Sequence, residues 1–181
     1  NVKLNIYKLA NTVKTMLEYL FPVEKVTSCF KSINSKNDLQ KFIQQRSAHI
    51  TQTTLYGYLK TRMGHKFTLM VDDEVFSKSI NIAKWNIYMV AIVDCTFYTF
   101  SYLIDKKDLK DNDSEQIFLN IINSEKTNGL SEEIYNKAKK DFYHRKDIIN
   151  FKNYYLNNPF EKSIFALYEW APIADELKKL D

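Results

Sequence analysis

Glycine and proline are scarce in this chain, with three of each among 181 residues. β-Sandwiches and barrels need a turn residue about every 8 to 12 positions, so this composition argues against them and favours helices. The two cysteines, Cys29 and Cys95, are too few for a disulfide framework or a four-thiolate zinc site. We expect both to be reduced thiols in an intracellular protein.

The sequence also lacks the short motifs that carry common enzyme chemistry. It has no glycine-rich phosphate loop, no dinucleotide-binding turn, no nucleophile elbow and no His-Glu-x-x-His helix. The three histidines, His49, His65 and His144, stand far apart and without the spacing of metal ligands. We therefore predict no catalytic residue, metal site or cofactor, and the motifs leave open whether the protein is an enzyme.

The length and the apolar content favour one domain over residues 1–181, because 45% hydrophobic residues supply a sizeable core. Apolar residues recur at helical spacing through most of the chain. The pattern predicts an all-α fold, a single compact bundle of five to seven helices around a long buried central helix. Helices are expected over residues 4–20, 37–63, 73–104 and 114–123, from 131 past 142 towards 155, and over 160–180, where Pro172 kinks or divides the last one.

Helix boundaries are marked by capping residues. Asn37 is the expected N-cap of the second helix and Gly64 its stop, while Asp72 or Asp73 caps the central helix. Gly57 lies inside the second helix, where it marks either a tolerated kink or a close approach of a neighbour.

Residues 85–104 form the most apolar stretch and are long enough to span a bilayer. The stretch contains Asn86, Asp94 and several hydroxyl residues, which are unfavourable in a membrane unless they are paired. We therefore expect a buried core helix here.

Charge is distributed unevenly along the chain. Residues 1–70 hold eleven Lys and Arg against three acidic residues, whereas residues 71–181 hold fifteen against nineteen. A basic N-terminal end suits a protein partner or an anionic membrane surface, although much of the lysine is also compatible with ordinary solvated surface. The acidic second half and the lack of a DNA-binding motif argue against nucleic acid.

Two groups of residues are candidates for a ligand site. His49, Tyr56 and Lys60 share one stripe of the second predicted helix, which is either a ligand-reading row or a mixed polar face. Asp94 falls on the apolar face of the central helix, where an unpaired carboxylate would be costly. It must pair with Arg46 or another cation, accept hydrogen bonds from hydroxyls, or take up a proton in a functional pocket that Lys84 and Trp85 flank.

Residues 44–46, 53–64, Phe76 and residues 79–85 resemble a family of small, uncharacterised alphaproteobacterial helical proteins. The resemblance covers about residues 40–95 and implies a cytoplasmic bacterial protein. Some family members are labelled esterases, but no serine nucleophile, oxyanion hole or His-Asp relay can be assigned to this chain, so that label carries no mechanism over.

The favoured function is that of a non-enzymatic, all-helical binding or adaptor protein that uses the basic surface of the first seventy residues. Such a protein is expected in the cytoplasm, either free or peripheral to a membrane. The alternative is a helical bundle with a small-molecule or hydrolase-like site around Arg46, Tyr56, Lys84 and Asp94.

Overall fold

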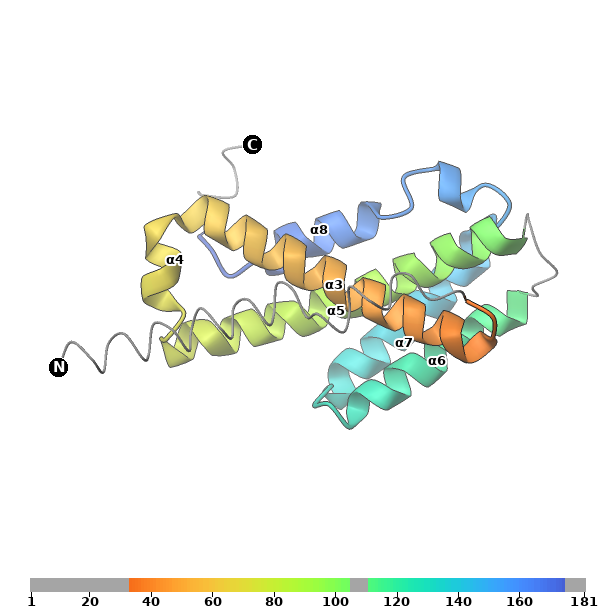
Figure 1. The fold of residues 1–181 in the computed structure, drawn as a ribbon, viewed down its shortest axis with the longest axis horizontal. Helices are drawn as coiled ribbons and strands as arrows, with labels where there is room; N and C mark the ends of the chain where they lie inside the picture. The colour runs from red at the N-terminus through yellow and green to blue at the C-terminus, as the bar shows by residue number, and fades with distance from the viewer. Residues whose placement is uncertain (1–32, 105–110, 175–181) are drawn as a thin grey trace. The chain divides into compact units, whose positions relative to one another are not determined.

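The computed structural model describes residues 33–104 and 111–174 (Figure 1). The chain divides into two compact units, residues 1–34 and residues 35–181. The first unit lies almost entirely outside the described residues, as do the helix expected over residues 4–20 and the residue Cys29. The single-domain prediction therefore stays a prediction, and the description below concerns the second unit.

The described residues are helical and contain no strand, which confirms the all-α prediction. Helix α5 is central, because α3, α6, α7 and α8 all pack against it (Figure 1). Within the described ranges there are six α-helices and one 3-10 turn: α3 (Lys36–Met63), α4 (His65–Met70), α5 (Glu74–Ile104), α6 (Asp111–Lys126), α7 (Glu132–Ile148), η1 (Tyr154–Leu156) and α8 (Glu161–Trp170).

The helix ends follow capping chemistry, with one correction. Ser35, not Asn37, caps α3, because its hydroxyl accepts the backbone N–H of Asp38. Gly64 ends α3 with a φ of 54°, as expected. Asp73 caps α5 by accepting the N–H of Phe76 at 2.8 Å.

The C-terminal half differs from the expectation in the lengths of its helices. Helix α6 begins at Asp111, three residues earlier than expected, and α7 ends at Ile148 rather than continuing towards residue 155. The last described helix ends at Trp170, two residues before Pro172, since proline disfavours the helical conformation of the residue that precedes it. Residues 175–181 lie outside the described part of the chain.

Helix α5 is long and apolar enough to cross a membrane by length and composition, but 67% of its most apolar window is buried inside the protein. The prediction of a buried central helix is therefore confirmed. Three fully buried rings join α5 to α6 and α7: Phe142 stacks on Phe118 at 4.1 Å and on Phe97 at 5.0 Å between ring centroids. Burial of each such ring contributes roughly 1.5–3 kcal/mol.

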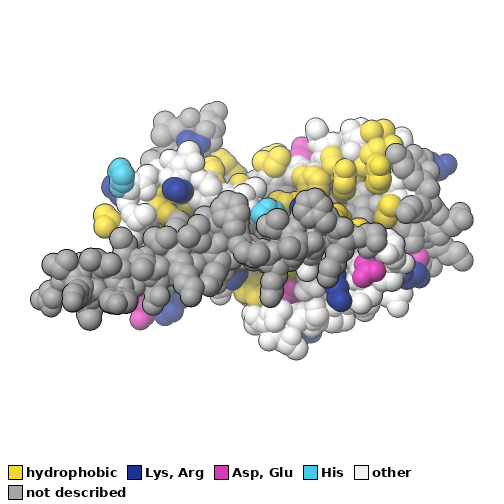
Figure 2. Space-filling view, viewed as in Figure 1, with side chains coloured by type: hydrophobic (Ala, Val, Ile, Leu, Met, Phe, Trp, Pro, Cys, Tyr) yellow, Lys and Arg dark blue, Asp and Glu magenta, His cyan; other side chains and the backbone are white. Residues whose placement is uncertain are grey.

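Helix α8 packs on the bundle through its small side chains. Ser163 and Ala166 are its buried residues, whereas Ile164 and Phe165 are 66% and 60% exposed. Figure 2 shows hydrophobic side chains gathered over the region where η1 and the start of α8 lie. The contact of α8 with α5 is therefore close, and most of the large apolar side chains of α8 remain outside the core.

Gly57, inside α3, and Gly64, at its C-cap, provide a pair of positions for testing helix stability. A Cβ at Gly57 would meet no atom of residues 33–104 or 111–174 within 4 Å, so none of these residues approaches the backbone closely there. Gly57→Ala should raise the free energy of unfolding by about 0.5–1 kcal/mol, because alanine has the higher helix propensity. Gly64→Ala should lower it by about 1 kcal/mol, because a positive φ strains any residue with a Cβ. Urea unfolding followed by circular dichroism measures both, and a loss of stability in Gly57→Ala would contradict the open environment.

Candidate functional site

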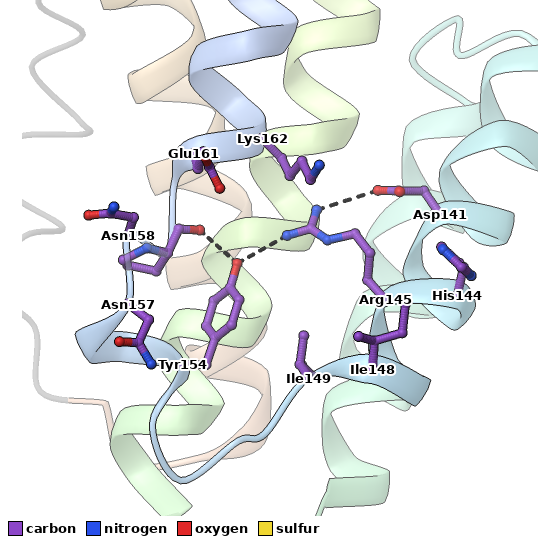
Figure 3. A pocket seen from close by; sticks show the side chains of 11 residues that line it. Asp141, His144, Arg145, Ile148, Ile149, Tyr154, Asn157, Asn158, Glu161 and Lys162 are labelled. Atoms are coloured by element: carbon purple, nitrogen blue, oxygen red, sulfur yellow. Dashed lines mark hydrogen bonds and ion pairs between the residues drawn. The ribbon is translucent and has the colours of Figure 1, made fainter.

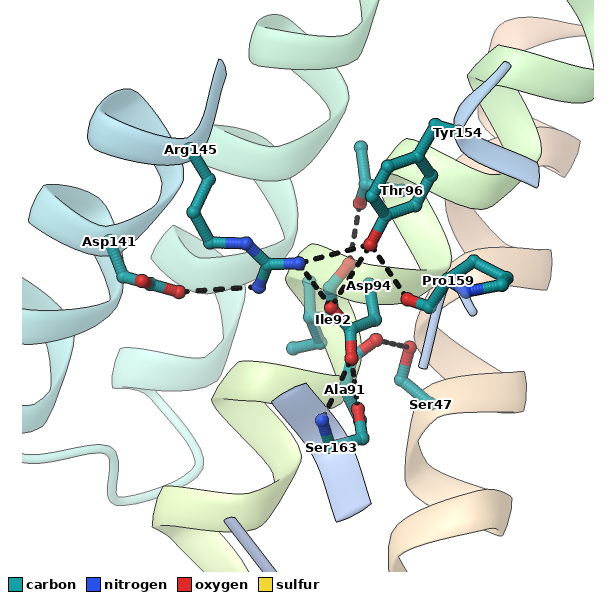
Figure 4. Close-up of polar contacts among 10 residues, drawn as sticks. All are labelled: Ser47, Ala91, Ile92, Asp94, Thr96, Asp141, Arg145, Tyr154, Pro159 and Ser163. Carbon is teal, nitrogen blue, oxygen red and sulfur yellow. Dashed lines mark hydrogen bonds and ion pairs between the residues drawn. The ribbon is translucent and has the colours of Figure 1, made fainter. Parts of the chain in front are cut away.

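The carboxylate of Asp94, in the middle of α5, is fully buried and lies at the centre of a polar network (Figure 4). Its Oδ1 forms an ion pair with Nη2 of Arg145 on α7, whose side chain is only 10% exposed. Its Oδ2 accepts two hydrogen bonds from Ser163 on α8, one from the backbone N–H at 2.9 Å and one from the hydroxyl at 2.5 Å. One carboxylate therefore joins three helices.

Asp94 also caps α8 from across the core. The residue at the N-cap position of α8 is Phe160, which has no side-chain acceptor, so no local cap forms. The first turn of a helix carries unpaired N–H groups and a partial positive charge, and a carboxylate satisfies both. Arg145 lies in the last turn of α7, where a cation is favoured for the opposite reason.

Tyr154 completes the network on the side of the connection between α7 and α8. Its hydroxyl lies 2.7 Å from the carbonyl oxygen of Pro159 and 3.3 Å from Oδ1 of Asp94, so its single proton goes to the nearer carbonyl. The hydroxyl oxygen in turn accepts Nη2 of Arg145 at 3.0 Å. Burial and the neighbouring charge of Asp94 raise the pKa of Tyr154, which keeps the phenol protonated.

The charge of Arg145 is secured by its surroundings. Burial alone would lower the pKa of this guanidinium, but the charge of Asp94 and the hydrogen bond to it raise the pKa overall. The guanidinium carbon also lies 5.3 Å from the centroid of the Phe97 ring, a cation–π contact. Arg145 is therefore a permanent cation in a fixed position.

A cleft of about 320 Å³ opens beside this network, between the end of α7 and the start of α8 (Figure 3). Its wall on α7 includes Asp141, His144 and Arg145, and α8 contributes Glu161 and Lys162. Tyr154 and the asparagine-rich turn at residues 157–159 close the third side. The buried network thus forms one wall of the cleft.

Several donors in the cleft wall are not used within the described part of the protein. Arg145 makes one long contact through Nη1, at 3.4 Å from Asp141, and its Nε has no hydrogen bond to a described residue. His144 and Lys162 are exposed and make no hydrogen bond or ion pair with described residues. These groups can donate to a polar ligand in the cleft.

Among the candidate site residues on α3, none reaches Asp94. Arg46 lies with its guanidinium 5.5 Å from the Phe42 ring and forms no ion pair with Asp94, so the expected partner of Asp94 is corrected to Arg145. Tyr56 packs edge-on against Phe67 at 6.2 Å. His49 and Lys60 are exposed on the same helix.

Lys84 and Trp85 belong to a second polar cluster, around the buried carboxylate of Glu125 on α6. Glu125 is 5% exposed and accepts hydrogen bonds from Tyr88 and Gln44, each at 2.7 Å, and from Asn128 at 2.9 Å. Burial lowers the pKa of Lys84, and the charge of Glu125 only partly offsets this. The structure therefore does not bring the predicted site together: Asp94 lies in one cluster, Lys84 and Trp85 lie at another, and the candidate residues of α3 lie in neither.

Sequence analysis missed Arg145, Tyr154 and Ser163. A signal for Arg145 was present, because it continues the apolar stripe of Ala138 and Phe142 at a spacing of three. Arg46 has the same kind of position on its own helix, so periodicity alone could not choose between the two. Ser163 carried no comparable signal, since its role depends on where α8 begins.

Comparisons with known proteins add no relative: no family model, no curated protein and no solved structure matches this chain. The resemblance to alphaproteobacterial helical proteins stays a prediction. The proposals below therefore depend on the geometry of the site itself.

The ion pair between Asp94 and Arg145 can be tested by a double-mutant cycle. Asp94→Ala should lower the free energy of unfolding by about 3–5 kcal/mol, because it leaves a buried guanidinium without its partner. The double variant Asp94→Ala/Arg145→Met should lose less free energy of unfolding than the two single variants lose together, and the difference should be about 1–3 kcal/mol. Urea unfolding of the three variants gives the coupling energy.

Asp141→Ala is the matched control, since it removes the partly exposed acid that contacts the same guanidinium at 3.4 Å. Its effect should stay below about 1 kcal/mol. Additive effects of the Asp94 and Arg145 changes would show that the ion pair does not contribute to stability.

Proposed function

We propose that this chain is a non-enzymatic helical binding protein that holds a small polar ligand in the cleft between α7 and α8. The observation that carries this proposal is the cleft of about 320 Å³, with a guanidinium held in its wall by a buried carboxylate. Small-molecule sites in proteins are typically concave, about 300–1,000 Å³ in volume, and lined by a few well-placed polar groups.

Preorganisation supports ligand binding at this position. Arg145 is held through Nη2 by Asp94 and Tyr154, so its remaining donors keep their place whether or not a ligand is present. Binding to a fixed donor avoids part of the entropy loss that ordering a flexible side chain would bring.

The same contacts favour binding over catalysis. The polar atoms of Asp94, Tyr154 and Ser163 are engaged with one another, with Arg145 or with the backbone of the α7–α8 connection. Groups that hold helices together in this way are poorly suited to act as a nucleophile or a base that must change its partners during a reaction.

A bulky substitution in the cleft wall tests the proposal. His144→Trp should fill part of the cleft and weaken any ligand there by about tenfold or more, because the ligand and the indole ring compete for one volume. Lys140→Trp is the matched control, one helical turn away on α7, exposed and outside the cleft lining. Ligands are first found by screening a fragment library against the wild-type chain by NMR. If the fragments bind both variants equally well, the cleft is not their site.

The basic N-terminal region is a second candidate, for an anionic membrane or an acidic protein partner. Residues 33–70 carry six Lys and Arg against one acidic residue. Lys41, Lys60 and Lys66 are exposed there and form no ion pair with a described residue. A surplus of cations along one segment attracts anionic surfaces through long-range electrostatics.

Liposome sedimentation tests this second candidate. The chain should bind vesicles that contain phosphatidylserine and should not bind neutral vesicles. Binding should fall steeply between about 50 and 500 mM salt, because added salt shortens the Debye length and screens the attraction. The variant Lys41→Gln/Lys60→Gln/Lys66→Gln should bind several-fold more weakly than a control with Lys137, Lys140 and Lys152 changed to Gln. Binding that does not depend on salt would rule out the electrostatic surface.

A further inference from the structure

One end of the cleft holds charges of both signs. Arg145 and Lys162 contribute cations, and Asp141 and Glu161 contribute carboxylates. Figure 3 shows Lys162, Glu161, Asp141 and the guanidinium of Arg145 together at this end. Because Asp94 already neutralises Arg145, the wall has no surplus of positive charge.

The side of the cleft formed by the end of α7 carries two apolar side chains. Ile148 and Ile149, at the end of α7, line it (Figure 3). The side chain of Ile148 is 69% exposed, and it belongs to the last turn of the helix. A ligand that covered it would remove apolar surface from water.

A ligand with a single charge fits this wall poorly. An anion that approached Lys162 and Arg145 would lie close to the carboxylates of Asp141 and Glu161, and a cation would meet the two basic side chains instead. Like charges at short range oppose binding, whereas a ligand that carries both charges meets an opposite charge at each.

We propose that the cleft recognises a small zwitterion with an apolar substituent, the chemistry of an apolar α-amino acid. The ligand carboxylate lies toward Lys162 and the free edge of Arg145, the ammonium group toward Asp141, and the apolar side chain over Ile148. This inference rests on the proposed function of the cleft and adds the class of its ligand.

Three probes that share one apolar group separate the contribution of the carboxylate to binding from that of the ammonium group. L-Leucine carries both charges, 4-methylpentanoate only the carboxylate, and isopentylamine only the ammonium group. Isothermal titration of the full chain at pH 7 should show leucine binding about tenfold or more tightly than either singly charged probe. Glycine, which has the same charges and no apolar group, should bind more weakly than leucine.

Charge-removing variants test the assigned contacts. Lys162→Gln should weaken leucine and 4-methylpentanoate several-fold and should not weaken isopentylamine, from which it removes a like charge. Asp141→Asn should weaken leucine and isopentylamine and should not weaken the carboxylate probe, for the same reason. Lys152→Gln and Asp147→Asn are the matched controls, since both residues are exposed and lie outside the cleft lining. Neither control should change leucine binding.

The outcomes distinguish this inference from the proposed function. If either singly charged probe binds as tightly as leucine, the zwitterion is wrong. If leucine does not bind, but fragments bind the wild-type chain and bind His144→Trp more weakly, the ligand class is wrong and the binding function stands. If leucine binds equally well to wild type and to His144→Trp, its site lies elsewhere and the inference fails.

Discussion

The burial of one carboxylate governs the architecture of the C-terminal half of this protein. Asp94 lies with 0% exposure in the most apolar helix of the bundle, where a charge without partners would oppose folding by several kcal/mol. Its partners come from two other helices, Arg145 in the last turn of α7 and Ser163 in the first turn of α8. The end of α7 and the start of α8 therefore both lie at the middle of α5. The chain that connects them must leave this point and return to it.

The cleft lies beside this buried network. Drawing the start of α8 onto Asp94 leaves the connection through η1 arched outward, and Tyr154 pins that arch through the carbonyl of Pro159. Arg145 then has one edge in the buried network and the other in the cleft wall. A single interaction thus stabilises the fold and presents a fixed donor to solvent, which links the stability of the protein to the binding function proposed for it.

The candidate site was predictable only in part. The apolar face on which Asp94 lies predicts a carboxylate that is paired with a cation, hydrogen-bonded or protonated, and the structure shows an ion pair with Arg145 and hydrogen bonds from Ser163. Of the two cations left open, Arg46 or another, the structure selects another, because helical spacing relates residues along one helix and says nothing about which helix lies opposite. Lys84 and Trp85, about two and a half to three turns before Asp94, belong instead to the cluster around Glu125. Residues of one helix therefore serve two separate clusters.

By itself, the sequence determined the longer helices of the described residues, though not the short α4, together with the apolar central helix and most of the boundaries that carry a capping side chain. These features depend on local periodicity and on hydrogen bonds within a few residues. Gly64, Asp73 and Ser131 mark helix ends for that reason. Only the tertiary structure decided that α8 is capped by a residue 69 positions earlier and that α7 supplies the guanidinium. Both choices depend on which helix faces which, and that order is set by the packing of whole helix faces rather than by any local pattern.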